Sequence, residues 1–271
     1  MDIMDLMGWE EFLIPYEQAV EELVVKFRAY SRELKKKGLH SPIEYVEGRV
    51  KKVGSILEKA HRKGIKYGES AEMLEDIAGI RIICRFVEDI QKVVSIVRER
   101  DGIDMEIINE GDYISNGKSS GYRSYHINIR YPVWTSEGAK SVAAEIQIRT
   151  MAMNFWAIIE HSLKYKYKGN MPEELRKRLI SAAEASYSLD VEMSAIRDEI
   201  MEAQRVIDTK NDVVDEIGAK IRALYANGSV DNIEELNARF LSVYEQDNLE
   251  TLEEFKKQLD ILTELYQIEL T

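Results

Sequence analysis

The sequence predicts an α/β or α+β domain with a mixed sheet of about five strands, followed by a helical C-terminal extension. Apolar residues recur every three or four positions across residues 9–34, which is typical of an amphipathic helix. Residues 127–131 and 142–148 alternate apolar and polar side chains, which is typical of strands. Up to residue 163 the order is helix, strand, helix, strand, helix, three strands and helix, which indicates a sheet flanked by helices.

The first helix ends at a basic run, residues 35–37, and at Gly38. Cations favour the negative pole of a helix, and glycine favours the turn that follows it. A strand is expected at residues 43–50 and a short helix at residues 51–63. One face of this short helix is basic, carrying Lys52, Lys59, Arg62 and Lys63. The ordinary interpretation is a solvated face, and the sharper one is a face that binds a nucleoside triphosphate tail.

The middle of the domain is arranged around an acidic position. Residues 80–84 are expected to form a strand with Asp76 at its mouth, and Gly79 would let a ligand come close. A helix at residues 87–100 and a strand at residues 105–108 follow. Residues 112–121 then form a polar, glycine-flanked loop of the kind that often carries function.

The last predicted strand places Glu145, Gln147 and Arg149 on one face, because successive strand side chains point to opposite faces. The carboxylate, the amide and the guanidinium could hold a metal, a base edge and a phosphate. For one strand taken alone, a solvated outer face is the better explanation. The second carboxylate, Asp76, favours a Mg²⁺ site instead. Mg²⁺ takes one or two carboxylates and phosphate oxygens, as nucleotidyl-transfer sites require.

Helices follow the sheet. Thr150 caps a helix, and His161 on it is expected to be a satisfied core histidine. The apolar stripe of this helix is Met151, Phe155, Ile158, Ile159 and Leu163. Residues 175–207 keep a 3.5-residue repeat that is typical of coiled-coil packing, and two more helices are expected at residues 231–244 and 249–268. This tail is either an intrachain bundle or an oligomer interface.

Composition restricts the class of protein. The chain has 271 residues and a net charge of −12, which argues against unspecific nucleic-acid binding. The acidic N-terminus is not a signal peptide, and no apolar stretch reaches membrane-spanning length. The lone cysteine, Cys84, excludes an intramolecular disulfide and fits a reducing compartment. We therefore expect a cytoplasmic protein with neither a membrane nor a nucleic acid as partner.

Short motifs follow one another in a fixed order, at residues 41–45, 48–51, 76–81, 121–126, 145–150, 153–156 and 160–162. Together they resemble the RelA/SpoT family of alarmone synthetases, and most of all its small, single-domain, hydrolase-free members. The resemblance extends roughly over residues 8–205. It implies a nucleotidyltransferase-like fold and a GTP pyrophosphokinase of the stringent response. Such an enzyme transfers the β,γ-pyrophosphate of ATP to the 3′-OH of GTP or GDP, making pppGpp or ppGpp.

The resemblance also implies roles for individual residues. Asp76 matches the Mg²⁺ ligand, and Glu145 matches the second carboxylate, which acts as metal ligand or base. Arg49 and Arg81 match the pair that sandwiches adenine, and Lys59 matches a phosphate contact of the donor. Tyr122 matches the aromatic residue that stacks on guanine, and the other residues of the acceptor region are Lys118, His126, Gln147 and Asn154.

Two further features concern assembly and regulation. The resemblance points to a homotetramer, which we expect to form through the first helix and the helix after Pro172. Residues 1–170 are then the synthetase domain with its N-terminal helix, and residues 171–271 a helical extension for oligomerisation or packing. In related tetramers an alarmone binds a central cleft. Val24 and Glu47 depart from the expected residues of that cleft, and Gly111 replaces a basic acceptor contact.

Two other functions stay open. A toxic relative puts pyrophosphate on the 3′ end of tRNA, which requires a basic surface. Residues 205–271 hold 7 basic and 15 acidic residues, a net charge of −8, which argues against that function. The other alternative is a non-catalytic nucleotide-sensing module, and the intact carboxylates Asp76 and Glu145 argue against it.

Overall fold

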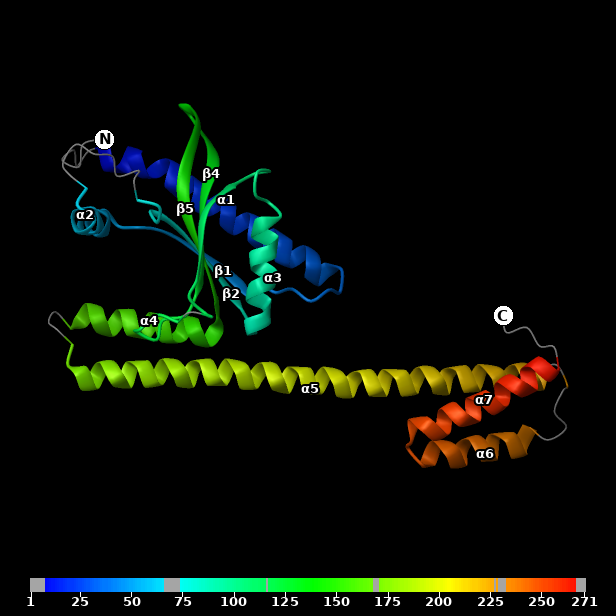
Figure 1. Ribbon diagram of the computed structural model, residues 1–271. Coiled ribbons are helices and arrows are strands. Elements are labelled where there is room, and N and C mark those ends of the chain that lie inside the picture. Colours follow the sequence, from blue (N-terminus) through cyan, green and yellow to red (C-terminus); the bar gives the residue numbers. More distant parts are fainter. Residues whose placement is uncertain are drawn as a thin grey trace. The chain divides into compact units, whose positions relative to one another are not determined.

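The computed structural model describes residues 8–65, 74–115, 117–167, 171–226, 228 and 233–266. These residues form α1 (Gly8–Lys36), β1 (Tyr45–Val50), α2 (Val53–Arg62), β2 (Ala78–Cys84), α3 (Val87–Arg98), β3 (Glu106–Asp112), β4 (Tyr125–Thr135), β5 (Gly138–Thr150), α4 (Met151–Lys166), α5 (Glu173–Ala226), α6 (Ile233–Glu245) and α7 (Leu249–Leu265). The predicted order of elements is confirmed, as is the fold class of a mixed sheet flanked by helices (Figure 1). No helix in these ranges is long and apolar enough to cross a membrane.

The five-stranded sheet has the order β1-β2-β5-β4-β3. Strands β2 and β5 run parallel, and the other neighbouring pairs are antiparallel. In the parallel pair, Gly79 lies opposite Glu145 and Arg81 lies opposite Gln147. This register brings the chain just after Asp76 beside the polar row of β5, although the two segments are far apart in the sequence.

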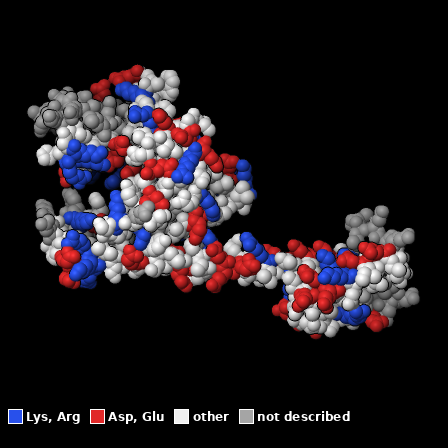
Figure 2. All heavy atoms as spheres, in the orientation of Figure 1, with Lys and Arg blue, Asp and Glu red and all other residues white. Residues whose placement is uncertain are grey.

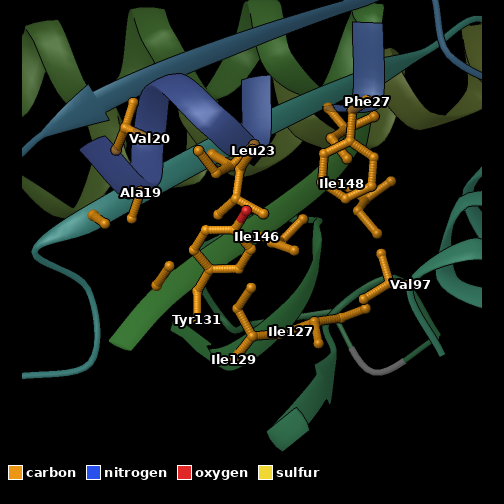
Figure 3. Close-up of a cluster of buried hydrophobic side chains, with 14 of the residues drawn as sticks. Ala19, Val20, Leu23, Phe27, Val97, Ile127, Ile129, Tyr131, Ile146 and Ile148 are labelled. Atoms are coloured by element: carbon orange, nitrogen blue, oxygen red, sulfur yellow. The ribbon is translucent and has the colours of Figure 1, made fainter. Parts of the chain in front are cut away.

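One face of the sheet is covered by α1 and α3 (Figure 1). The strands point every second side chain at these helices, and on β5 the buried set is Val142, Ala144, Ile146 and Ile148. Figure 3 shows Leu23 and Phe27 of α1 in one buried cluster with Ile146 and Ile148 of β5. The predicted alternation of β5 is therefore confirmed, and its polar residues point away from the core.

Helix α1 crosses β1 at very short range, and the contact depends on Gly48. A Cβ on Gly48 would lie 2.4 Å from Val20 Cγ1 and 2.8 Å from Val24 Cγ2. Real side chains do not approach so closely, so glycine is the residue that lets this helix lie on the strand.

Helix α4 starts at its predicted cap, since the side chain of Thr150 accepts a hydrogen bond from the Met153 backbone N–H at 3.1 Å. The buried face of α4 is Met153, Asn154, Trp156 and Ala157. The predicted apolar stripe is instead exposed: Met151, Phe155, Ile158, Ile159 and Leu163. Because α4 is apolar on both faces, the spacing of apolar residues did not reveal which face packs.

By packing, the chain divides into two compact units, Met1–Ser194 and Ala195–Thr271. The first part of α5 belongs to the unit that contains the sheet. The functional division expected after residue 170 stays a prediction. In the second unit, the end of α5 packs with α6 and α7 around its own core of Val213, Ile217, Ile221, Leu224, Leu236, Leu252, Phe255 and Leu259.

The apolar repeat of α5 has two different environments. From Val213 to Leu224 it is covered by α6 and α7, so for this stretch the intrachain-bundle interpretation holds. Earlier positions of the same repeat are exposed, namely Leu189, Met193, Ile196, Ile200 and Ile207. For these positions an oligomer interface stays a prediction.

Candidate active site

The sheet face opposite α1 and α3 carries the polar side chains. Residues of four neighbouring strands line up there in two rows, because the strands pair in register. One row is Arg49, Gly79, Glu145 and Asn128, and the next row is Glu47, Arg81, Gln147 and His126. Strand alternation thus places Arg49, Arg81, His126, Glu145 and Gln147, all predicted site residues, on one surface.

Asp76 lies in the turn before β2 and is held by two lysines. Lys51 Nζ and Lys59 Nζ both donate to Asp76 Oδ2, the latter at 2.5 Å. Burial raises the pKa of the Asp76 carboxyl, but the hydrogen bonds from the two lysines outweigh it, so the pKa is lowered. Burial in turn lowers the pKa of Lys51. Asp76 Oδ1 is buried and has no hydrogen-bond partner among the described residues, so one carboxylate oxygen is uncommitted there.

Glu145 lies in the middle of β5, and both of its oxygens accept hydrogen bonds. Oε1 lies 2.9 Å from His126 Nδ1, and Oε2 lies 2.6 Å from Gln147 Nε2. Burial raises the pKa of the Glu145 carboxyl, but its contact with His126 outweighs burial and the pKa is lowered. Glu145 and Asp76 line the same cavity of about 70 Å³, with Arg49, Arg81 and Gln147.

Arg49 and Arg81 line this cavity and also a larger one, of about 280 Å³, that reaches Tyr122 and α4. Arg81 Nη1 forms a long ion pair of 3.6 Å with Glu47 Oε2. Arg81 Nε is buried without a hydrogen-bond partner among the described residues. A guanidinium group is planar, so it can stack on the face of a base, and its free N–H groups can still donate hydrogen bonds. The predicted donor pair and the predicted acceptor aromatic therefore share one hollow.

Tyr122 follows a glycine that the fold requires. Gly121 has a φ of +85°, and a Cβ on it would lie 2.6 Å from the Cβ of Ala183 on α5. Only glycine combines that conformation with so close an approach. The Tyr122 ring is consequently half-buried beside α4 and α5. Its hydroxyl lies 2.8 Å from His126 Nε2 and accepts a hydrogen bond from Arg149 Nη2.

Besides Tyr122, two other predicted acceptor residues lie outside the rows. Lys118 Nζ lies 4.0 Å from the ring centroid of Tyr113 and 5.3 Å from that of Tyr122. Asn154 is buried on α4, where its Nδ2 donates to the Tyr45 hydroxyl at 3.2 Å. The described residues that line the two cavities do not include Asn154. The structure thus brings Lys118 to Tyr122 and leaves Asn154 at the margin of the site.

Comparison with known proteins identifies the family of the chain. Residues 48–170 match a family model described as a region found in RelA / SpoT proteins. The chain is 54% identical to the GTP pyrophosphokinase YjbM of Bacillus subtilis over 207 residues, which are 76% of this chain and 97% of that protein. The chain belongs to the RelA/SpoT family.

Solved structures of RelA/SpoT proteins include two of the small alarmone synthetase 1 of Bacillus subtilis. The one bound to its product pppGpp has a TM-score of 0.68 and 54% identity, covering 71% of this chain and 98% of that chain. The one bound to AMPCPP has a TM-score of 0.63 and 51% identity, covering 72% of this chain and 98% of that chain. The resemblance inferred from the motifs is therefore confirmed.

Three residues at this site have contacts that the sequence did not predict. Lys51 was assigned only to the start of a helix, yet it holds Asp76. Arg149 was expected in the polar row as a possible phosphate contact, and the structure adds its hydrogen bond to the Tyr122 hydroxyl. The interpretation of His161 as a core histidine was wrong, because its side chain is exposed and lines the larger cavity. His161 follows the cavity residue Ala157 by four positions, so the two lie on one face of α4, but only the structure shows that this face lines the cavity.

The residues of the smaller cavity fit Mg²⁺. Asp76 and Glu145 supply carboxylate oxygens, and Asp76 Oδ1 has no other partner within the described chain. The residues that the structure describes contain no group of three or more His, Cys, Asp and Glu side chains that could hold a metal ion. Two carboxylates suffice for Mg²⁺ when a nucleotide provides phosphate oxygens. The donor set is therefore that of a metal bound together with its nucleotide.

Positive charge gathers around this face, although the whole chain is acidic. Figure 2 shows Lys and Arg side chains over α2 and, across a hollow, over α4 and the start of α5. On α5 these include Arg176, Lys177 and Arg178. Such a distribution suits a phosphate-rich ligand more than a long nucleic acid.

Proposed function

We propose that this RelA/SpoT protein is a GTP pyrophosphokinase, which transfers the β,γ-pyrophosphate of ATP to the 3′-hydroxyl of GTP or GDP. The observation that carries the proposal is one cavity lined by Asp76, Glu145, Arg49 and Arg81. The relative YjbM is named a GTP pyrophosphokinase, and the solved synthetase 1 binds pppGpp in one structure and AMPCPP in another. The pppGpp complex supports a guanosine product here, and the AMPCPP complex supports an adenosine donor.

The donor nucleotide is assigned to the side of the site formed by β1, β2 and α2. Arg49 and Arg81 hold the adenine between their guanidinium planes, which stack well on bases. Lys59 binds the triphosphate, and Lys51 lies beside it on the same carboxylate. These two ammonium groups offer several donors to phosphate oxygens when they turn from Asp76.

The acceptor nucleotide is assigned to the side formed by β4, β5 and the loop before β4. The Tyr122 ring stacks on guanine, and Lys118 lies near that ring. His126 and Gln147 contact Glu145 and thus border the place where the attacking 3′-hydroxyl would lie. Asn154 remains part of this proposal, although its side chain contacts Tyr45.

Asp76 and Glu145 would hold Mg²⁺ in this reaction. When bound, the metal neutralises charge that develops on the transferring phosphates. The chain itself positions the reactants: the arginines fix the donor base, and the carboxylate of Glu145 orients the 3′-hydroxyl by accepting its hydrogen bond. This holding role accounts for the two hydrogen bonds that restrain Glu145.

We also propose that the chain assembles as a homotetramer in the cytoplasm. An exposed apolar row on α4 supports assembly, since Phe155 is 69% exposed and Ile158 is 47% exposed. Monomers rarely leave such rows in water. The only cysteine, Cys84, is buried and free, which supports a reducing compartment. Light scattering of the wild-type chain and of Phe155→Glu tests assembly. A monomer mass for the wild type would contradict it.

A panel of acceptors tests the proposed reaction. Purified protein is incubated with labelled ATP, Mg²⁺ and, separately, GTP, GDP, GMP and tRNA. We expect label on GTP and GDP and none on tRNA. Labelled tRNA without labelled guanosine nucleotides would instead support the tRNA-modifying alternative. Nucleotide binding without any transfer would support the sensing module.

A further inference from the structure

Five side chains on the polar face form a closed ring of hydrogen bonds. Arg149 can only donate, and an ionised Glu145 can only accept, so two branches run from one to the other. In the first branch, Arg149 Nη2 donates to the Tyr122 hydroxyl, which lies 2.8 Å from His126 Nε2, and His126 Nδ1 lies 2.9 Å from Glu145 Oε1. In the second, Arg149 Nη2 donates to Gln147 Oε1 at 2.7 Å, and Gln147 Nε2 donates to Glu145 Oε2 at 2.6 Å.

Arg149 is costly to bury if its role is packing alone. It is only 4% exposed, and burial lowers the pKa of its guanidinium. Its hydrogen-bond partners in the described chain are uncharged oxygens, those of Ser124, Tyr122 and Gln147. Burying a charge without a paired counter-ion is unfavourable, and an apolar residue of similar size would fill the space at lower cost.

The ring of hydrogen bonds fixes the tautomer of His126 and the orientation of the Gln147 amide. His126 Nδ1 faces the Glu145 carboxylate, so the ring assigns the proton to Nδ1 and leaves Nε2 to accept from the Tyr122 hydroxyl. Gln147 Oε1 accepts from Arg149, so the amide presents its NH₂ group to Glu145. If either choice were reversed, a lone pair would face the carboxylate and repel it.

We propose that Arg149 is a positioning residue for pyrophosphate transfer. It aligns both carboxylate oxygens of Glu145 through the Tyr122–His126 branch and the Gln147 branch, and its side chain also lines the larger cavity. The inference rests on the proposed function, because it assigns Glu145 to that reaction. Residues that orient a metal-binding side chain in this manner typically change affinity or activity by about 10- to 100-fold when they are replaced.

The chain offers a matched control. Arg98 also donates to a tyrosine hydroxyl, that of Tyr125 at 3.1 Å, and to the carboxylate of Glu110 at 2.7 Å. Arg98 lies on α3, which covers the opposite face of the sheet. Arg98→Lys and Tyr125→Phe therefore remove the same types of bond away from Glu145.

Steady-state kinetics of Arg149→Lys, Tyr122→Phe and the double variant provide the first test. Lysine keeps the charge but cannot reach both acceptors, and phenylalanine keeps the ring that stacks on guanine. Each single variant should lose about tenfold or more in kcat, with the KM of both nucleotides changed by less than about threefold. Because both act through one branch, the double variant should be less impaired than the product of the single effects. The two control variants should keep the wild-type kcat.

The second test does not depend on activity. The chain has only four histidines, so ¹⁵N NMR of the imidazole rings can follow His126 in the protein without nucleotides. The wild type should hold its proton on Nδ1, and Arg149→Lys and Tyr122→Phe should both lose that fixed tautomer. If the wild type makes no alarmone, the proposed function fails, while this spectrum still tests the ring.

Several results would overturn the inference. A raised acceptor KM with unchanged kcat in Arg149→Lys would make Arg149 a direct nucleotide contact. A wild-type His126 that is protonated on Nε2 would break the first branch. Fully independent effects of Arg149→Lys and Tyr122→Phe on kcat would show that the two residues do not act together. A matching loss of kcat in the two control variants would reduce the effect to general destabilisation.

Discussion

Replacing Tyr122 by alanine should weaken the acceptor far more than the donor. Stacking of a base on an aromatic ring is worth about 1–3 kcal/mol, and about 1.4 kcal/mol corresponds to a factor of ten. The KM of GTP or GDP should therefore rise by about 5- to 150-fold. The KM of ATP should change by less than about threefold, because the donor is assigned to the arginines of β1 and β2.

The structure adds a second effect of this substitution that must be separated from the first. The Tyr122 ring is half-buried beside α4 and α5, so its removal also lowers the free energy of unfolding. Replacing a fully buried aromatic residue by alanine costs about 3–5 kcal/mol, so about half of that applies here. Kinetics are therefore measured well below the Tm of the variant, and thermal unfolding of each protein defines that temperature.

Initial rates are recorded while one nucleotide is varied and the other is saturating. Trp134→Ala serves as the control, because this aromatic residue is 77% exposed at the β4–β5 turn and should leave both KM values unchanged. An unchanged acceptor KM together with a raised ATP KM would refute the assignment and reverse the two nucleotide positions.

Three other perturbations have defined outcomes. Asp76→Asn should abolish synthesis while far-UV circular dichroism remains native, and normal turnover by this variant would remove the metal assignment. Burial raises the pKa of Asp190 to about 6, above about 3.9 in the unfolded chain, so the folded state holds a proton that the unfolded chain releases. Urea unfolding of the wild type should thus lose stability as the pH rises from about 4 to about 6 through this group. Asp190→Asn should not show that loss, and equal slopes would contradict the assignment. Gly48→Ala should cost about 1–3 kcal/mol in urea unfolding, because its Cβ meets Val20 at 2.4 Å, and Val20→Ala should restore part of it. No loss in Gly48→Ala would mean that α1 moves freely on β1.

Most of the fold could be predicted because each element has a clear period. On β5, strict alternation from Val142 to Ile148 identified both the buried face and the polar row. On α1, the run of apolar residues and Gly38 at its end set both limits of the helix within a few residues. Local patterns of this kind reflect burial directly, so they survive without knowledge of the tertiary contacts.

Helix α4 shows where such patterns stop being informative. Its apolar residues occur on both faces, and the face that packs is chosen by the sheet and by α5, which the local sequence does not reveal. Phe155 is exposed, while the polar Asn154 is buried against Tyr45. His161 was misassigned for the same reason, since it lies on the face that lines the cavity.

Within the site, sequence patterns identified residues but not their partners. The motif resemblance singled out Asp76 and Glu145, and the structure places both at one cavity. That Lys51 holds Asp76 depends on how the start of α2 turns back toward β2, and no repeat encodes such a contact. Arg149 was visible in the polar row, but its hydrogen bond to Tyr122 joins residues 27 positions apart.

The fate of the donor phosphates tests the central claim most directly. The protein is incubated with Mg²⁺, GTP and ATP labelled at the β-phosphate, and AMP and the guanosine products are quantified together. Our account predicts equal amounts of AMP and of pppGpp that carries the label in its 3′-pyrophosphate, with both lost in Glu145→Gln. Formation of ADP with a single added phosphate, or AMP beside unlabelled guanosine nucleotides, would contradict it.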